Sequence, residues 1–261
     1  MEYQEKTIVI NGKTYQYIDT QKGKNTIVAL HGLSGGKQEC LYLLKPLLGQ
    51  HRVVSLDLPG HNGVCNHKYH LEAQAQYVVD FIKYLKLTNF TLFGFSYGGL
   101  VALATIDVLK QPIPAIIWST PVYTNSDNLT NQAKFSLWLM SKVNRNWYKK
   151  ILTSKTALWF FRLSGLNLSV RDIVDGLLKY ENSQTPTFCQ AFYQLIPLPK
   201  NSPLLFLFGT HDALTRERAY HTLKLISPKH RKVLIANGGH FGTTEGRQKA
   251  IEEIKKFLEN K

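Results

Sequence analysis

The sequence predicts an α/β fold, namely a mostly parallel eight-stranded sheet with helices on both faces and an inserted helical cap. Two observations support this prediction. Short apolar runs alternate with helical stripes over residues 26–118, and the alternation returns over residues 203–258. Buried strands that alternate with helices are typical of a parallel sheet covered on both faces. Between these stretches, residues 121–200 contain helical stripes and no convincing strand.

The first part of the chain opens with a hairpin. Asn11-Gly12, a dipeptide that favours tight turns, separates two short strands at Thr7–Ile10 and Tyr15–Ile18. Apolar runs then predict strands at Thr26–Leu30, Val53–Leu56, Phe90–Phe93 and Ala115–Trp118. Helical patterns lie between these strands at Gln38–Leu48, Leu71–Leu85 and Leu100–Leu109.

The second part of the chain begins with helices alone. Helical stripes occur around residues 131–143, 147–163, 169–180 and 187–196. Strands then return at Pro203–Phe208 and Lys232–Ala236, alternating with helices at Arg216–Leu225 and Thr244–Leu258. We therefore predict a core built from residues 1–120 and 201–261, with a helical cap inserted at residues 121–200.

The composition is that of an ordinary globular protein with an unusual charge. Hydrophobic residues make up 44% of the 261 residues and charged residues 19%, which excludes a disordered chain. The 32 Lys and Arg against 18 Asp and Glu give a net charge of +14, which favours an anionic partner or surface. Because the charges are scattered and no nucleic-acid-binding motif is present, we expect no nucleic-acid partner.

The sequence also bears on the location of the protein in the cell. The first residues, MEYQEKTIVING, contain acids and no apolar run, and no stretch approaches 18 consecutive apolar residues. We therefore expect neither a secretory signal nor a membrane-spanning helix. The three cysteines, Cys40, Cys65 and Cys189, are odd in number and widely spaced, so they imply no disulfide framework. A reduced, cytoplasmic location is the expectation.

The strongest chemical motif is Gly94-Phe95-Ser96-Tyr97-Gly98-Gly99, which connects the strand Phe90–Phe93 to the helix Leu100–Leu109. A G-x-S-x-G turn between a strand and a helix is typical of a nucleophilic serine. The turn must be tight and strained to expose the serine Oγ, and side chains at positions 94 and 98 would collide with neighbouring backbone. We expect Ser96 to be the nucleophile.

A serine nucleophile needs a base that an acid orients, and with this turn the acid and then the base follow the serine in the chain. Asp212 follows the strand Pro203–Phe208, and His240 follows the strand Lys232–Ala236 in a glycine-rich loop. Because parallel strands end at the same edge of a sheet, we expect both residues near Ser96. Asp212 could instead cap the next helix, and Asp127 is the rival acid.

The negative charge that develops on the substrate in the transition state needs N–H donors. One donor is expected from the backbone of Tyr97, the residue after the nucleophile. The other is expected from the loop His31-Gly32-Leu33-Ser34-Gly35-Gly36, where the N–H of Leu33 is the best candidate. We interpret His31 as a structural histidine that shapes this loop, because His240 suits the role of base better.

Together these motifs resemble those of the α/β-hydrolase superfamily, in its serine-nucleophile branch with a helical cap. The similarity covers, in chain order, His31-Gly32, Asp57-Leu58-Pro59-Gly60-His61, Gly94–Gly99, Gly209–Asp212 and Gly239-His240. It implies hydrolysis of a carboxylic ester, or of a thioester or amide, through an acyl-enzyme on Ser96 without a cofactor. One departure is Asn62, where the family often has glycine.

Two other functions stay open. The same scaffold can carry carbon–carbon bond hydrolysis or lyase chemistry on an anionic keto-acid, with Arg145, Arg162 or Arg171 binding the carboxylate. Some family members are receptors that bind a ligand without catalysis, but the complete set of catalytic residues argues against that function. Epoxide hydrolase and dehalogenase chemistry is disfavoured, because those relatives have an aspartate nucleophile where this chain has Ser96.

The predicted cap is basic and rich in aromatic residues. Four of its rings are candidates to contact an apolar acyl chain, although most rings in such a position pack the cap onto the core. These four are Trp138, Phe160, Phe161 and Phe188. The segment Trp147–Arg162 could also contact an anionic membrane surface, while a solvated helix face explains the same charges. Its cations are Lys149, Lys150, Lys155 and Arg162.

A cluster of possible metal ligands lies after the fourth predicted strand. It consists of His61, Cys65, His67 and His70. The cluster lacks a second paired motif and the regular spacing of a zinc site, so we predict no metal.

Overall fold

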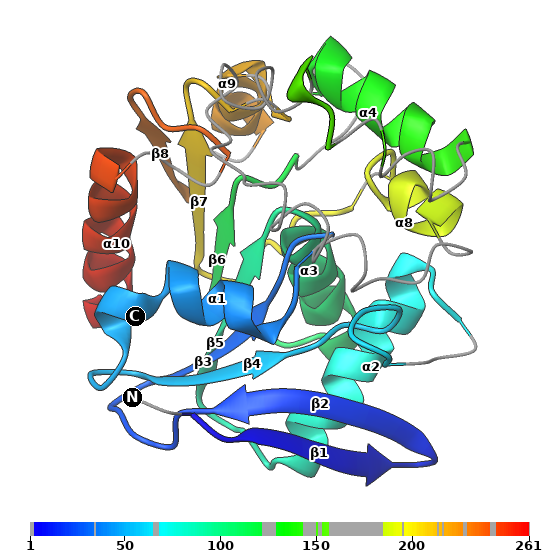
Figure 1. The fold of residues 1–261 in the computed structure, drawn as a ribbon. Coiled ribbons are helices and arrows are strands. Elements are labelled where there is room, and N and C mark those ends of the chain that lie inside the picture. The colour runs from blue at the N-terminus through cyan, green and yellow to red at the C-terminus, as the bar shows by residue number, and fades with distance from the viewer. Residues whose placement is uncertain are drawn as a thin grey trace.

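In the computed structural model of the chain, the described residues are 3–33, 35–64, 68–121, 129–142, 150, 153–156, 185–194, 196–212, 214–215, 217–226, 229–240 and 244–260. They form an eight-stranded sheet with the strand order β1-β2-β4-β3-β5-β6-β7-β8 (Figure 1). The strands are β1 (Glu5–Ile10), β2 (Lys13–Asp19), β3 (Thr26–Leu30), β4 (Arg52–Leu56), β5 (Phe90–Phe95), β6 (Ala115–Trp118), β7 (Leu204–Gly209) and β8 (Arg231–Ile235).

The sheet is mostly parallel, as predicted. Strand β1 pairs antiparallel with β2, and β2 pairs antiparallel with β4. All the other neighbouring strands, from β4 to β8, run parallel to one another. The strands β5, β6 and β7 are adjacent, so the residues that follow them leave the sheet at the same edge.

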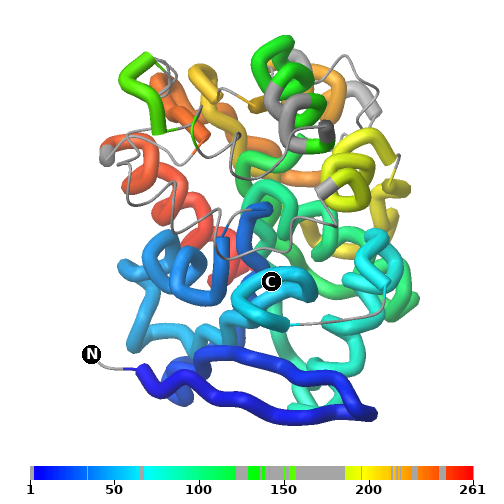
Figure 2. Tube along the Cα trace, turned by 45° about the vertical axis from the view of Figure 1, so that its right-hand side comes forward, coloured from blue at the N-terminus to red at the C-terminus, as the bar shows by residue number. Residues whose placement is uncertain are grey.

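Helices cover both faces of the sheet. They are α1 (Lys37–Leu43), the 3-10 turn η1 (Lys45–Leu47), α2 (Leu71–Tyr84), α3 (Tyr97–Leu109), α4 (Asn131–Lys142), α8 (Thr185–Ala191), α9 (Glu217–Ile226) and α10 (Thr244–Glu259). Figures 1 and 2 both show α1 and α10 on one side of the sheet, and α2 and α3 on the other.

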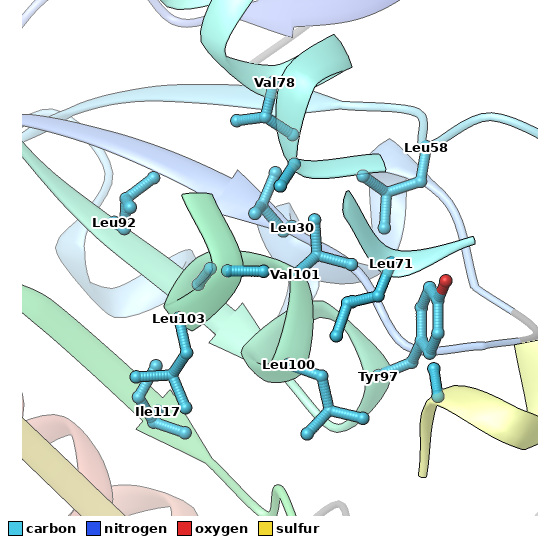
Figure 3. Packing of buried hydrophobic residues seen from close by; sticks show 14 of the residues in the cluster. Leu30, Leu58, Leu71, Val78, Leu92, Tyr97, Leu100, Val101, Leu103 and Ile117 are labelled. Atoms are coloured by element: carbon cyan, nitrogen blue, oxygen red, sulfur yellow. The ribbon is translucent and has the colours of Figure 1, made fainter. Parts of the chain in front are cut away.

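The core follows from the period of two along each strand. In β3, Val28 and Leu30 belong to the buried cluster shared with α2 and α3. Ile27 and Ala29 of the same strand belong to the second buried cluster, shared with α1 and α10. Figure 3 shows the first cluster, with the ring of Tyr97 at its margin. A strand buried on both faces therefore reads as the continuous apolar run that the sequence shows.

Most elements lie within two residues of their predicted bounds, and three helices differ more. The expected helix Gln38–Leu48 is divided into α1 and η1, because Pro46 has no N–H to continue the helical hydrogen bonds. Helix α3 begins at Tyr97, three residues before the predicted start at Leu100. Gly98 and Gly99 weaken the helical pattern of the sequence, although both fit the first turn of the helix. Helix α8 ends at Ala191, where the backbone hydrogen bonds shorten to the third preceding residue.

The described part of the predicted cap contains α4 and α8. These two helices contact each other, and both views show them together at one end of the molecule (Figure 2). The expected helices around residues 147–163 and 169–180 lie outside the described residues, apart from 150 and 153–156. The division of the chain at residues 121 and 200 therefore stays a prediction.

The sequence predicts neither a membrane-spanning helix nor a disulfide framework, and the described residues can be compared with both expectations. None of the described helices is long and apolar enough to cross a membrane. Cys40 and Cys189 are free, buried thiols, and Cys65 lies outside the described residues. Burial raises the pKa of Cys189 to about 12, so this thiol stays protonated at neutral pH.

Candidate active site

The candidate nucleophile lies on a strained turn between β5 and α3. Ser96 has φ 51° and ψ −115°, a conformation that costs a non-glycine residue about 1–3 kcal/mol. A Cβ on Gly94 would lie 2.4 Å from the Cα of Gly99, and a Cβ on Gly98 would lie 2.2 Å from the carbonyl oxygen of Leu30. Both glycines are therefore required by close backbone contacts, as the motif predicts.

The two peptide groups that flank Ser96 are held by residues at and just after the end of β6 and by the first turn of α3. The N–H of Ser96 donates to the carbonyl oxygen of Trp118 at 2.9 Å. The carbonyl oxygen of Ser96 accepts from the N–H of Gly99 at 3.0 Å and from the hydroxyl of Thr120 at 2.9 Å. These contacts fix the strained backbone from both sides.

Asp212 and His240, predicted to lie together, form a buried pair. The His240 Nδ1 atom lies 3.0 Å from Oδ1 and 3.1 Å from Oδ2 of Asp212. Both side chains are buried from solvent. An N–H at Nδ1 leaves Nε2 unprotonated, which is the tautomer that can accept a proton.

Asp212 also organises the loop that carries it. Its Oδ1 atom accepts from the N–H of Leu214 at 2.8 Å and from the N–H of Thr215 at 3.1 Å. Because α9 begins only at Glu217, the carboxylate anchors this turn and does not cap the helix. The rival acid, Asp127, lies outside the described residues.

The loops after β7 and β8 cross at close range, which brings the acid and the histidine together. A Cβ on Gly209 would lie 2.1 Å from the carbonyl oxygen of Gly238, so only glycine fits there. That carbonyl accepts from the N–H of His211 at 2.9 Å. The ring of His240 lies 5.1 Å from the ring of Phe95, the residue before Ser96. The Asp212–His240 pair therefore lies beside the strained turn.

The loop after β3 is held by His31. Its Nε2 atom accepts from the N–H of Leu58 at 2.9 Å, so the proton of the neutral ring is on Nδ1. Nδ1 donates to the carbonyl oxygen of Gly32 at 2.7 Å, and the N–H of Gly35 donates to the same oxygen at 3.0 Å. Because the peptide group is planar, this carbonyl fixes the direction of the Leu33 N–H. The contacts support the interpretation of His31 as a structural residue.

The loop after β4 supports the same region. The Nε2 atom of His61 contacts the carbonyl oxygen of Leu33, and its Nδ1 lies 3.3 Å from the carbonyl oxygen of Pro59. Burial lowers the pKa of His61, although these carbonyl contacts act in the opposite direction. Asn62 has φ 50°, a conformation that asparagine tolerates, and its amide donates to Asp57 at 2.7 Å. This contact explains how asparagine replaces the glycine of related loops.

Asp57 forms a buried ion pair beneath these loops. Lys37 Nζ lies 2.6 Å from Asp57 Oδ2, and the N–H of Lys37 donates to Oδ1 at 2.8 Å. Burial acts to lower the pKa of Lys37, but the contacts with Asp57 and Glu5 raise it overall. Because each charge is paired and hydrogen-bonded, the network ties α1 to the end of β4.

The possible metal ligands serve other purposes where they are described. His61 contacts the loop carbonyls, and His70 accepts from the N–H of Ala73 at 3.4 Å as the N-cap of α2. Cys65 and His67 lie outside the described residues. Among the residues that are described, no group of three His, Cys, Asp or Glu side chains could hold a metal ion.

The aromatic candidates of the cap differ in burial. Phe188 of α8 is fully buried, with its ring 5.4 Å from that of His61 and 5.8 Å from that of Tyr97. It packs α8 onto the core, which is the alternative interpretation given for such rings. Trp138 of α4 is 55% exposed and stacks on Phe135 at 5.9 Å. Phe160 and Phe161 lie outside the described residues.

Thr120 is a residue of this site that no sequence motif indicated. Thr120 lies two residues after β6 and is buried, and its hydroxyl contacts the carbonyl oxygen of Ser96. Its position two residues after a predicted buried strand indicates a residue at the edge of the sheet. Its contact with Ser96 follows only from the strand order, in which β5 and β6 are neighbours. The proposed carboxylate-binding residues Arg145, Arg162 and Arg171 lie outside the described part of the chain.

Comparisons with known proteins bear on the family and the fold of the chain. A sequence profile described as the alpha/beta hydrolase family matches residues 27–253. An esterase from Exiguobacterium antarcticum is 19% identical, with a TM-score of 0.75 and coverage of 98% of this chain and 100% of that chain. A thermophilic esterase from Thermogutta terrifontis is 18% identical, with a TM-score of 0.72 and coverage of 99% of this chain and 98% of that chain. At these identities the structural likeness shows the fold alone.

Two further relatives carry other names. E-2-(acetamidomethylene)succinate hydrolase is 14% identical, with a TM-score of 0.76 and coverage of 99% of this chain and 97% of that chain. The dihydrolipoyllysine-residue acetyltransferase component of the acetoin cleaving system of Pseudomonas putida is 21% identical over 252 residues. The match covers 91% of this chain and 64% of that protein, so the chain spans less than two thirds of its length.

Proposed function

Because the chain belongs to the alpha/beta hydrolase family, we propose that it is a serine hydrolase that cleaves a carboxylic ester through an acyl-enzyme. Ser96 is the nucleophile, His240 is the general base and acid, and Asp212 orients the imidazole. The backbone N–H groups of Leu33 and Tyr97 bind the oxyanion. The reaction needs no cofactor in this proposal, since water completes the hydrolysis.

The observation that carries the proposal is the buried Asp212–His240 hydrogen bond beside the strained Ser96. In the reaction, the Oγ of Ser96 attacks the ester carbonyl while Nε2 of His240 takes its proton. The tetrahedral oxyanion is stabilised by N–H groups that are already oriented. His240 then gives its proton to the leaving alcohol. A water molecule that gives its proton to His240 attacks the acyl-enzyme, the bond to Oγ of Ser96 breaks, and His240 returns the proton to Oγ as the carboxylic acid leaves.

The two candidate oxyanion donors are well suited to this task. Each N–H belongs to a peptide group whose carbonyl oxygen accepts two hydrogen bonds, at Gly32 for the Leu33 donor and at Ser96 for the Tyr97 donor. Donors that are fixed before the reaction need no reorganisation when charge develops, which is the source of their catalytic effect.

The predicted cap at residues 121–200 supplies the substrate pocket in this proposal. Trp138, Phe160 and Phe161 are its candidate contacts with the acyl chain, whereas the buried Phe188 anchors α8. The relatives named as esterases support an ester substrate.

A second candidate is hydrolysis of an anionic substrate with the same three residues. It is favoured by the net charge of +14 and by the likeness to E-2-(acetamidomethylene)succinate hydrolase. Carbon–carbon bond hydrolysis of a keto-acid belongs to this candidate.

The test is a substrate panel with a matched inactive variant. Purified protein and Ser96→Ala are assayed on p-nitrophenyl esters of graded chain length, on a thioester, and on an anionic keto-acid. We expect wild-type protein to hydrolyse at least one ester, and Ser96→Ala to hydrolyse the same ester more slowly by a factor of about 10⁴ or more. Preferential turnover of the keto-acid would favour the second candidate, and unchanged esterase activity of Ser96→Ala would exclude both.

A further inference from the structure

The side chain of Thr120 lies directly after β6, against the strained turn at Ser96. Thr120 is 1% exposed, and its Oγ1 atom lies 2.9 Å from the carbonyl oxygen of Ser96 and 3.2 Å from that of Trp118. Ser119, the first residue after β6, has φ 50°. Ser119 is therefore a further residue with a positive φ beside Ser96.

The hydroxyl proton of Thr120 has one preferred acceptor. The carbonyl oxygen of Trp118 already accepts from the N–H of Ser96 at 2.9 Å, whereas the contact with the carbonyl oxygen of Ser96 is the shorter one. A hydroxyl has a single proton to donate. We therefore assign this proton to the carbonyl oxygen of Ser96.

That carbonyl belongs to the same planar peptide group as the N–H of Tyr97. In a trans peptide group the carbonyl and the N–H point in opposite directions, so a bond that fixes one also fixes the other. The N–H of Gly99 donates to the same oxygen at 3.0 Å, from inside α3. Thr120 is thus the contact that ties the peptide group to the sheet.

We propose that Thr120 is a positioning residue, which orients the Tyr97 N–H toward the oxyanion through its hydrogen bond to Ser96. The inference rests on the proposed function, because the Tyr97 N–H acts as a donor only in that reaction. Thr120 touches no reacting atom. It does for the Tyr97 donor what His31 does for the Leu33 donor, by binding the carbonyl oxygen of the same peptide group.

The sequence of the turn agrees with this role. A Cβ on Gly99 would lie 2.0 Å from Oγ1 of Thr120 and 2.8 Å from its Cβ. The second glycine of Gly98-Gly99 is therefore needed to admit the Thr120 side chain. A larger residue at position 99 would displace the hydroxyl from the carbonyl oxygen of Ser96.

The test compares two conservative variants. Thr120→Val removes the hydroxyl at similar volume, and Thr120→Ser keeps the hydroxyl and removes a methyl group. We expect Thr120→Val to lower kcat on a p-nitrophenyl ester about 10- to 100-fold, since loss of a whole oxyanion donor costs about 10²–10³-fold. KM should change less than about twofold, and Thr120→Ser should retain kcat within about threefold.

Thr105→Val is the matched control. Thr105 is a buried threonine of α3, and its hydroxyl donates to the carbonyl oxygen of Val101 at 2.7 Å. The variant removes the same group from a similar environment, away from Ser96. We expect kcat to stay within about twofold of wild type, although both valine variants lower the thermal midpoint.

A second measurement needs no substrate. Hydrogen exchange of the peptide covering residues 96–103 reports the bond from the Gly99 N–H to the carbonyl oxygen of Ser96. We expect faster exchange there in Thr120→Val than in wild type or Thr120→Ser. If the wild type hydrolyses no ester, the proposed function fails and this exchange decides whether Thr120 orders the turn. If the wild type is active but Thr120→Val matches Thr105→Val in kcat and wild type in exchange, the inference alone is overturned.

Discussion

The substitution Asp212→Asn separates the two tasks of this carboxylate. Oδ1 lies 3.0 Å from Nδ1 of His240 and accepts from two backbone N–H groups, at 2.8 and 3.1 Å, so this position must keep an oxygen atom. The asparagine oxygen will occupy that position, and its NH₂ group will replace Oδ2, 3.1 Å from Nδ1 of His240. An NH₂ group at that position requires Nδ1 to accept, which moves the ring proton to Nε2.

The wrong tautomer cannot take the proton of Ser96. In serine proteases with the same three residues, this substitution lowers kcat by about 10⁴-fold, and we expect a loss of that order here. Stability should fall only slightly, because the turn keeps both backbone hydrogen bonds. Asp212→Ala loses those bonds as well, and hydrogen bonds to a charged group contribute about 1.5–3 kcal/mol each.

The assay is kcat/KM on a p-nitrophenyl ester together with thermal unfolding of wild type, Asp212→Asn and Asp212→Ala. We expect both variants to be inactive by a similar factor, with Asp212→Ala clearly the less stable. An Asp212→Asn protein that keeps kcat/KM within tenfold of wild type would refute the assigned role of the carboxylate.

Three further predictions concern stability, pH and charge. Phe188→Ala should lower the free energy of unfolding by about 3–5 kcal/mol, measured by urea denaturation, because the ring is fully buried between α8 and the core; a loss below about 1 kcal/mol would contradict its role as an anchor. The pKa of His61 is lowered from 6.5 in the folded state, so the unfolded state binds its proton more readily. The contribution of His61 to stability should be constant above about pH 6.5 and fall as the pH decreases below it, so the free energy of unfolding from urea denaturation should fall less in His61→Gln than in wild type. If the net charge of +14 attracts anionic substrates, added salt should lower kcat/KM for an anionic ester and leave a neutral ester unchanged, while an equal response of both would exclude steering.

The fold could be predicted from local patterns because its central strands, β3 to β7, are buried on both faces. Such strands appear as uninterrupted apolar runs, as in Thr26–Leu30, which the structure reproduces without change as β3. The predicted helix boundaries were wrong where one or two residues outweigh the periodic pattern. Pro46 divides a helical stripe into two elements. Gly98 and Gly99 interrupt the apolar pattern in the first turn of α3, so the predicted helix started too late.

The positions of Ser96, Asp212 and His240 could be predicted because each follows a strand at the same edge of a parallel sheet. Contacts between neighbouring loops could not be predicted in the same way. Thr120 meets Ser96 because β5 and β6 are adjacent, and His61 meets Leu33 because β3 and β4 are adjacent. Which ring of the cap is buried depends likewise on tertiary packing, and the sequence alone did not distinguish Phe188 from Trp138.

Covalent labelling of the nucleophile tests the central claim most directly. A fluorophosphonate reacts with a serine only when a neighbouring base activates it and the developing charge is stabilised. After treatment of the intact protein, peptide mass spectrometry should find one modified residue, Ser96, and the Ser96→Ala and His240→Ala variants should remain unlabelled. Absence of labelling at Ser96 in the folded wild-type protein, or equal labelling of His240→Ala, would contradict the assignment.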